Sequence, residues 1–301
     1  MYRKKVKITR PCKQQETGGE KLKHNFVFLY GQVVNSPRIY RDNNTGEYIR
    51  GMCSINVIRG KRDYGDGSFS QLQYDIPIIL SGNADIIKEM ATWKEFDMVE
   101  IKGAITTQEV NKSTTCKCGH KNTAEGNLVF INPIYASRRE TGITKEQGLA
   151  LLKKRCEISN MVTVVGALCR EPETYTSPRG VTVTQYNLAI MRKFRIRENP
   201  AEERTDFPWV KSFGRIAEMD AKALKLNARV LVDGHLQARE VDRTTVCEKC
   251  MTGYQWQDRA LEIVPYAVEY LQGHNPFKRE TDEDKEEEQN ISVADQVLSA
   301  T

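Results

Sequence analysis

The sequence reads NMVTVVGALCREPE at 160–173, QYNLAIMRKFRIR at 185–197, DFPWVKSFGRIAE at 206–218 and ARVLVDGHLQAREV at 228–241. Each piece holds a short run rich in valine, isoleucine, leucine or aromatic residues. Turn-forming glycine and proline residues separate these runs. Short β-rich runs of this kind predict a small all-β barrel or sandwich.

The piece DFPWVKSFG at 206–214 carries the strongest indication of function. Alternate side chains of an extended strand share one face, so Phe207, Trp209, Lys211 and Phe213 are expected together. A lysine between aromatic positions favours exposure of that face, because burying an unpaired lysine is costly. Exposed aromatic rings stack on unpaired bases, and cations contact phosphates. The alternative is an amphipathic strand whose aromatic side chains belong to the core.

The order of the motifs resembles the bacterial single-stranded DNA-binding protein family. These motifs are N-x-V-x-x-x-G from Asn160, E-P-E, YNLAIMRKF, DFPWVKSFGRIAE and VLVDGHLQARE. The resemblance implies the five-stranded OB barrel, which binds single strands across an open face. It places Phe194, Phe207 and Phe213 where the family has base-stacking aromatic residues. Trp209 stands where the family often has a polar or basic residue.

Two sets of contacts to nucleic acid are expected in this segment. The stacking set is Phe194, Phe207, Phe213 and Trp209, extended by Tyr254 and Trp256. The phosphate-contacting set is Arg192, Lys193, Arg195, Arg197, Lys211, Arg215 and Arg239.

An internal repeat predicts a second barrel of the same kind. NFVFLYGQVVNSPRIY at 25–40 aligns with NMVTVVGALCREPETY at 160–175. VEIKGAITTQEV at 99–110 aligns with VLVDGHLQAREV at 230–241. Because the same motifs recur in the same order, the chain is expected to contain two tandem OB-fold barrels.

The two copies differ on the face that carries the aromatic residues. Tyr74, Ile76, Ile78 and Leu80 replace Phe207, Trp209, Lys211 and Phe213, so the first face is largely aliphatic. The first barrel is expected to contact nucleic acid through Tyr74 and the loop residues Arg59, Lys61, Arg62, Tyr64 and Phe69. A purely structural first barrel is the alternative.

Composition predicts five parts of the chain. They are a basic N-terminal arm (1–23), the first OB fold (24–140), a linker helix (141–156), the second OB fold (157–275) and a disordered acidic tail (276–301). Residues 278–301 contain eight acidic and three basic residues, a net charge of −5. Since the whole chain carries +5, the rest carries +10, which is typical of a polyanion binder with an acidic appendage.

Four of the eight cysteines occupy equivalent hairpins of the repeat, in TTCKCGHKN at 114–122 and TTVCEKCMTGY at 244–254. A zinc ion bound by Cys116, Cys118, Cys247 and Cys250, within one chain or across a dimer, is one interpretation. A contribution from His120 is another, and the third is that the thiols bind no metal. No apolar secretion signal is evident. We therefore expect a cytoplasmic, nucleoid-associated protein without disulfides.

The sequence therefore predicts a protein that binds and protects single-stranded DNA in replication, recombination or DNA transfer, without enzymatic activity. It has no phosphate-binding glycine loop and no nucleophile–base signature. The resemblance implies a homodimer and a tail that recruits replication or recombination proteins, although the family's usual tip is absent here. No apolar run is long enough to span a membrane. The alternatives are an OB-fold interaction scaffold and an RNA-binding OB protein.

Overall fold

The computed structural model describes residues 23–60, 71–178, 180–193 and 204–276. The chain is mostly β, with a few short helices. The first part contains β1 (His24–Val33), β2 (Arg38–Arg41), β3 (Tyr48–Ile58), β4 (Tyr74–Asp75), β5 (Ile78–Ser81), α1 (Ala84–Met90), β6 (Met98–Thr115) and β7 (Lys121–Glu140). Two helices follow, α2 (Lys145–Lys154) and α3 (Cys156–Ser159). The second part contains β8 (Asn160–Leu168), β9 (Glu173–Thr176), β10 (Thr182–Met191), β11 (Thr205–Asp206), β12 (Trp209–Phe213), α4 (Gly214–Ala223), β13 (Arg229–Val246) and β14 (Gly253–Gln272).

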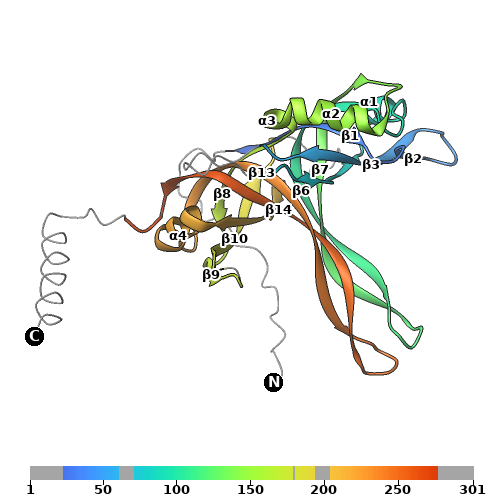
Figure 1. Ribbon diagram of the computed structural model, residues 1–301. Coiled ribbons are helices and arrows are strands. Elements are labelled where there is room, and N and C mark those ends of the chain that lie inside the picture. The colour runs from blue at the N-terminus through green and yellow to red at the C-terminus, as the bar shows by residue number, and fades with distance from the viewer. Residues whose placement is uncertain (1–22, 61–70, 179, 194–203, 277–301) are drawn as a thin grey trace, which may run out of the picture.

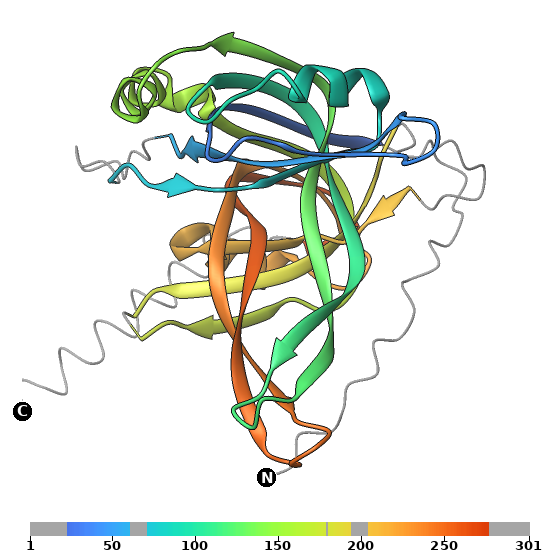
Figure 2. The same cartoon turned by 90° about the vertical axis from the view of Figure 1, so that its right-hand side faces the viewer.

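The strands close into two circuits with the same order. In the first, β1 pairs with β3 and β6, β3 with β5, β5 in parallel with β7, and β7 with β6. In the second, β8 pairs with β10 and β13, β10 with β12, β12 in parallel with β14, and β14 with β13. Both circuits are five-stranded barrels, in agreement with the repeat in the sequence (Figures 1 and 2).

Aligned glycines bend the long strands of both barrels. The register of β6 against β7 shifts at Gly103, and that of β13 against β14 shifts at Gly234. A β-carbon at Gly103 would lie 2.6 Å from the carbonyl oxygen of Asn132, and one at Gly234 only 2.2 Å from that of Val264. The bulge therefore requires glycine, because the partner backbone approaches too closely for any side chain.

Aligned asparagines brace the first strand of each barrel. The Asn25 side chain donates to the carbonyl oxygen of Ile105 and accepts from its N–H, both at 2.9 Å. Asn160 makes the same pair of bonds with Leu236, at 2.8 and 2.9 Å. Both asparagines are buried, so each amide satisfies two backbone groups that would otherwise be unpaired.

Two features join the barrels into one body. Strand β1 runs antiparallel to β8, with Phe28 opposite Met161, so the two circuits share one continuous sheet. A reciprocal pair of carboxylates then crosses between the barrels. Asp75 on β4 accepts from the N–H of Ala238 on β13 at 2.8 Å, and Asp206 on β11 accepts from the N–H of Thr107 on β6 at 2.8 Å. Asp75 is also paired with Arg59, and Asp206 with Arg192. We call these two sets of contacts the carboxylate clasps.

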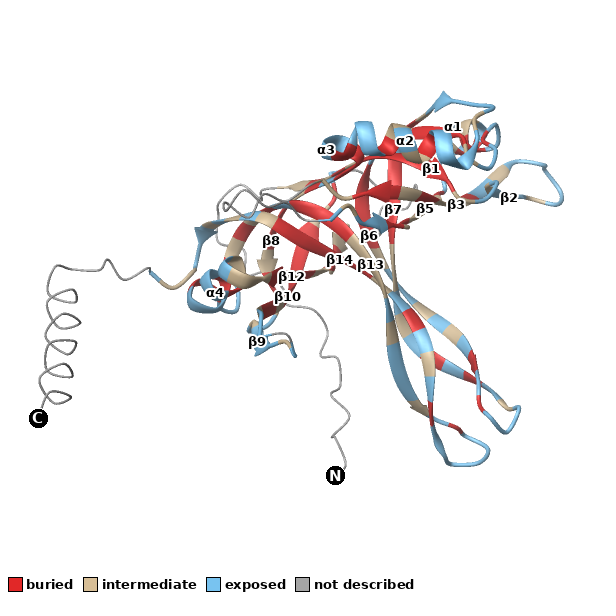
Figure 3. Ribbon diagram, in the orientation of Figure 1, coloured by how far each residue is buried: buried red, intermediate tan, exposed pale blue. Residues whose placement is uncertain are grey.

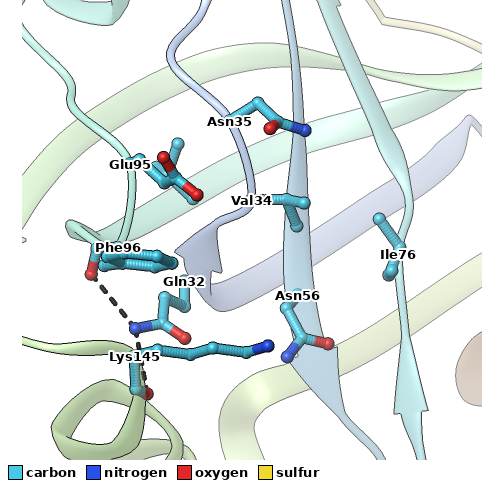
Figure 4. Close-up of a pocket in the computed structure, with 9 residues that line it drawn as sticks. Gln32, Val34, Asn35, Asn56, Ile76, Glu95, Phe96 and Lys145 are labelled. Carbon is cyan, nitrogen blue, oxygen red and sulfur yellow. Dashed lines mark hydrogen bonds between the residues drawn. The ribbon is translucent and has the colours of Figure 1, made fainter.

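The helix α2 begins at the capping box expected from Thr144 and Gln147. Gln147 donates its N–H to the Thr144 hydroxyl at 3.3 Å, and Thr144 donates its N–H to the Gln147 side chain at 2.8 Å. The amide nitrogen of Gln32 lies 3.3 Å from the carbonyl oxygens of Phe96 and Lys145, beside a pocket also lined by Asn56 (Figure 4). This contact fixes the start of α2 against the first barrel.

The hairpins β6–β7 and β13–β14 extend well beyond the barrels and lie side by side in both views (Figures 1 and 2). Buried residues concentrate in the barrels, whereas the hairpins are mostly exposed (Figure 3). Within the described ranges, no helix has the length and apolar character needed to cross a bilayer.

Candidate nucleic-acid interface

The alternation expected in DFPWVKSFG is present in the structure. Trp209, Lys211 and Phe213 on β12 are each partly exposed, whereas the intervening Val210 and Ser212 are buried. Strand β12 pairs with β10, and the pleat directs successive side chains to opposite sides of the sheet. The aromatic and lysine side chains therefore face outwards, and the interpretation that they form the core is wrong for this strand.

Strand β9 adds an aromatic ring to this face, and the segment between β8 and β9 adds a cation. Val183 on β10 lies opposite both Tyr175 on β9 and Phe213 on β12, so the two rings flank it. The Lys211 ammonium lies 5.7 Å from the Tyr175 ring centre and 6.0 Å from that of Phe213. The Arg170 guanidinium lies 4.8 Å from the Trp209 ring. We call this surface the β9–β10–β12 face: Arg170, Tyr175, Trp209, Lys211 and Phe213.

Sequence analysis missed Arg170 and Tyr175 as members of this face. Tyr175 is 42% exposed, on a short strand whose four residues are all exposed. The sequence feature that could have identified Tyr175 is its alignment with Tyr40 in the repeat, which places a tyrosine at the same position of both barrels. Arg170 precedes the Glu-Pro-Glu turn, and only its contact with Trp209 indicates where it lies.

Phe207 lies at the junction of the barrels, apart from Trp209, Lys211 and Phe213. Its N–H donates to the hydroxyl of Thr107 on β6 at 3.0 Å, and its carbonyl accepts from the Asn187 amide at 2.8 Å. The Phe207 ring is partly exposed. Its position therefore extends the aromatic row from β12 towards the first barrel.

On β2 and β4 of the first barrel, two tyrosines are exposed: the expected Tyr74 and also Tyr40, which was not expected. Tyr40 on β2 is 47% exposed and lies opposite Arg50 on β3. Ile76, Ile78 and Leu80 are partly buried, in keeping with the aliphatic pattern. Tyr74 on β4 is 39% exposed. Tyr40 and Arg50 were not singled out from the sequence.

Two arginines expected to contact phosphate belong to the carboxylate clasps instead. Arg192 is 4% exposed and its Nε lies 2.6 Å from Asp206. Arg59 contacts Asp75 at 2.6 and 2.9 Å. Both predictions are wrong for the same reason. Each guanidinium is paired with a buried carboxylate, and that carboxylate accepts a hydrogen bond from the other barrel.

One further prediction is corrected by a partner within the chain, and that for Arg239 stays a prediction. Arg239 forms a two-point ion pair with Glu262, at 2.5 and 3.2 Å, and its side chain is 38% exposed. Tyr254 is 7% exposed and its hydroxyl lies 2.6 Å from that of Thr114, so its ring is not an open stacking surface. Trp256 is partly exposed and its indole N–H points to Thr245 at 3.4 Å.

Lys193 and Arg215 remain exposed, as a phosphate contact requires. The other expected contacts lie outside the described residues: Phe194, Arg195, Arg197, Lys61, Arg62, Tyr64 and Phe69. Residues 1–22 of the basic arm (1–23) and residues 277–301 of the acidic tail (276–301) also lie outside them.

The four hairpin cysteines converge on one point. Cys116 and Cys118 lie at the tip of β6–β7, and Cys247 and Cys250 lie at the tip of β13–β14. Their sulfur atoms all lie within 4.8 Å of one another, and the pairs 116–250 and 118–247 are 3.7 Å apart. His120 is not part of this group. The meeting of two hairpin tips within one chain could not be read from the spacing of the cysteines.

The thiols of this cluster differ in acidity. Hydrogen bonds from the backbone of Cys250 and Lys249 lower the pKa of Cys247 to about 6, against the opposing effect of burial. A backbone hydrogen bond from Cys118 lowers the pKa of Cys116, but burial and the neighbouring thiols outweigh it and raise the value to about 11. The cluster therefore contains a thiol that ionises near neutral pH.

Comparison with known families addresses the second barrel directly. A model described as the single-strand binding protein family matches residues 159–252. The second barrel is therefore similar to the single-strand binding protein family. The match covers β8 to the second cysteine pair, and so includes the whole β9–β10–β12 face.

Curated single-strand binding relatives match a stretch of similar length. The single-stranded DNA-binding protein 1 of Chlorobaculum tepidum is 28% identical over 90 residues, which is 30% of this chain and 56% of that protein. The single-stranded DNA-binding protein of Halalkalibacterium halodurans is 36% identical over 83 residues, which is 28% of this chain and 48% of that protein. The chain spans about half the length of these curated relatives.

A solved structure extends the likeness in fold to both barrels. The wild-type single-stranded DNA binding protein from Thermus aquaticus aligns with a TM-score of 0.51 and 17% identity. The alignment covers 85% of this chain and 96% of that one. At this identity the likeness concerns the fold, and it supports the OB-type architecture of a chain with two barrels.

Proposed function

We propose that this chain binds single-stranded DNA with little sequence preference, on the β9–β10–β12 face. The observation that carries the proposal is the outward row of Trp209, Lys211 and Phe213 on a barrel that matches the single-strand binding protein family model. On this proposal the chain covers and protects exposed single strands during replication, recombination or DNA transfer. It acts by binding and catalyses no reaction.

The chemistry of the face suits an unpaired strand. Every base has a π-face, so stacking on Tyr175, Trp209 or Phe213 tolerates any sequence, at about 1–3 kcal/mol per base. Lys211 and Arg170 lie against these rings, where a backbone phosphate of a stacked nucleotide comes within reach. When Lys or Arg contacts a phosphate, counterions condensed on the DNA are released. The affinity for DNA therefore falls as the salt concentration increases.

The decisive experiment replaces Trp209 and Phe213 by alanine, singly and together, and measures the Kd for oligo-dT by fluorescence anisotropy. Each single change is expected to cost about 1–3 kcal/mol, or about 5- to 150-fold in Kd. The matched control is Tyr135→Ala, because Tyr135 is 42% exposed and lies under Lys102 at 5.6 Å but is outside the face. Unchanged affinity in the double variant, with Tyr135→Ala also unchanged, contradicts the proposal.

The same titration separates the alternatives. Stacking does not recognise the 2′-hydroxyl, so matched DNA and RNA oligomers compared under one salt condition decide between the two substrates. An interaction scaffold predicts no binding of either oligomer, even in dilute buffer.

We also propose a homodimer, so that four barrels assemble, and a cytoplasmic, nucleoid-associated location. The family resemblance supports both proposals. Sedimentation of the full chain tests the first, and a monomer at micromolar concentration contradicts it. Recruitment of replication or recombination proteins by residues 277–301 is a further proposal, tested by comparing their capture by the full chain and by a chain ending at residue 276.

A further inference from the structure

Two cysteine pairs that are more than a hundred residues apart meet at the tips of the long hairpins. Cys116 and Cys247 occupy the same position in the two hairpins, each directly after the last paired residue of its strand. Each is buried, whereas Cys118 and Cys250 are exposed. We propose that these four cysteines bind one zinc ion within a single chain, and that the ion clamps the β6–β7 hairpin to the β13–β14 hairpin.

The spacing of the sulfur atoms fits a tetrahedral zinc site. A Zn–S bond of about 2.3 Å places the sulfurs of a regular tetrahedron about 3.8 Å apart. The two pairs measured between hairpins are 3.7 Å apart, and all four atoms lie within 4.8 Å. A disulfide requires about 2.05 Å, so both cross-hairpin pairs are at the separation of metal ligands.

The backbone of each tip turns so that both of its cysteines face the same point. The N–H of Gly119 donates to the carbonyl of Cys116 at 2.8 Å, and that of Met251 donates to Cys247 at 2.9 Å. Gly119 has φ of 81° and Met251 has φ of 56°. The left-handed conformation is unfavourable for methionine, so this turn is held by its surroundings. Two tight turns thus present two thiols each, as a four-thiolate zinc site requires.

Contacts other than the thiols already hold the two tips together. The N–H of Glu248 donates to the Asn122 side chain at 3.0 Å, and the hydroxyls of Thr114 and Tyr254 lie 2.6 Å apart. Cys116, Cys247 and Tyr254 form a small buried cluster with Trp256 packed against it. The hairpins therefore bring the ligands together before the metal binds, which reduces the ordering that binding must impose.

The ligand set also defines what the ion does. Four thiolates and one Zn²⁺ carry a net charge of −2, and the lysines at 117 and 249 sit next to ligands in the two turns. A site with four protein ligands has no open position for water or substrate, so the ion is structural. The proposal does not depend on nucleic-acid binding, since the cluster lies at the hairpin tips and not on the β9–β10–β12 face.

The test is a metal analysis of the purified full chain without DNA. One zinc per chain is expected, together with its release when four thiols are titrated by a mercurial reagent. The Cys247→Ser/Cys250→Ser variant is expected to lose the zinc. Cys169→Ser is the matched control and is expected to keep it, because Cys169 lies in the second barrel, away from the cluster.

A second measurement keeps the proposal falsifiable if the double variant does not fold. The metal-free wild-type chain is titrated with Co²⁺, and thiolate-to-cobalt charge-transfer bands that saturate at one equivalent are expected. Hydrogen exchange of the tip amides is expected to quicken at least ten-fold when the metal is removed. Absence of zinc and of cobalt bands, one metal per two chains, two disulfides in place of four thiols, or zinc retained by the double variant would each overturn the proposal.

Discussion

The two carboxylate clasps predict unequal stability losses at Asp206 and Asp75. Replacing Asp206 by alanine leaves the Arg192 guanidinium, 4% exposed, without its carboxylate and leaves the N–H of Thr107 without its acceptor. Removing one partner of a buried ion pair costs about 3–5 kcal/mol. The loss is the penalty for removing the carboxylate that is paired with a buried guanidinium. The intact pair need not be strongly stabilising, since burial raises the pKa of Asp206 despite the opposing effect of Arg192.

Asp75→Ala is the internal comparison, because it removes the equivalent carboxylate of the other barrel. The Arg59 side chain is 18% exposed, against 4% for Arg192. Water therefore compensates the Arg59 charge better after the substitution, and a smaller loss of about 1–3 kcal/mol is expected.

Urea unfolding at pH 7.5, followed by circular dichroism, measures both losses. The double variant Arg192→Ala/Asp206→Ala is expected to recover part of the loss of Asp206→Ala, because it contains no buried guanidinium that has lost its carboxylate. A more exposed ion pair provides the baseline: Arg139→Ala, which removes the contact with Glu100, is expected to cost less than about 1 kcal/mol. Equal losses for the two aspartates, or a loss below about 1 kcal/mol for Asp206→Ala, would refute this account of the clasps.

Two further predictions concern buried polar groups. Burial raises the pKa of Asp220 from 3.8 to about 6, against the effect of hydrogen bonds from Ser212 and Tyr270. The free energy of unfolding is therefore expected to fall by about 3 kcal/mol as pH rises from about 4 to above 6. Asp220→Asn should be more stable than wild type at pH 8 but not at pH 4.5, and an equal difference in urea midpoint at both values contradicts this. Asn160→Ala leaves two buried backbone groups unpaired, so we expect a loss of about 2–4 kcal/mol. Asn25→Ala is expected to match it in thermal and urea unfolding, and losses that differ by more than about 1.5 kcal/mol argue against equivalent roles.

Local pattern was enough to predict the strands and the aromatic face. A pleated strand alternates its side chains with a period of two, so DFPWVKSFG contains the orientation of Trp209, Lys211 and Phe213 in its own order. The repeat likewise identified two barrels, because aligned positions such as Gly103 and Gly234 carry the same backbone requirement. These inferences succeeded because their physical cause lies within a few residues or recurs at a matched position.

Long-range partners could not be inferred in the same way. The sequence does not show whether an arginine in a basic stretch contacts a phosphate or a buried carboxylate. Arg192 contacts the carboxylate of Asp206, which also accepts a hydrogen bond from the N–H of Thr107. The residue type of the four hairpin cysteines identified them as candidate metal ligands. Their convergence depends on how two hairpins 131 residues apart leave a pair of fused barrels. Chain order contains the chemistry of each side chain. Which charges neutralise each other, and which thiols meet, follows from the packing of one barrel against the other.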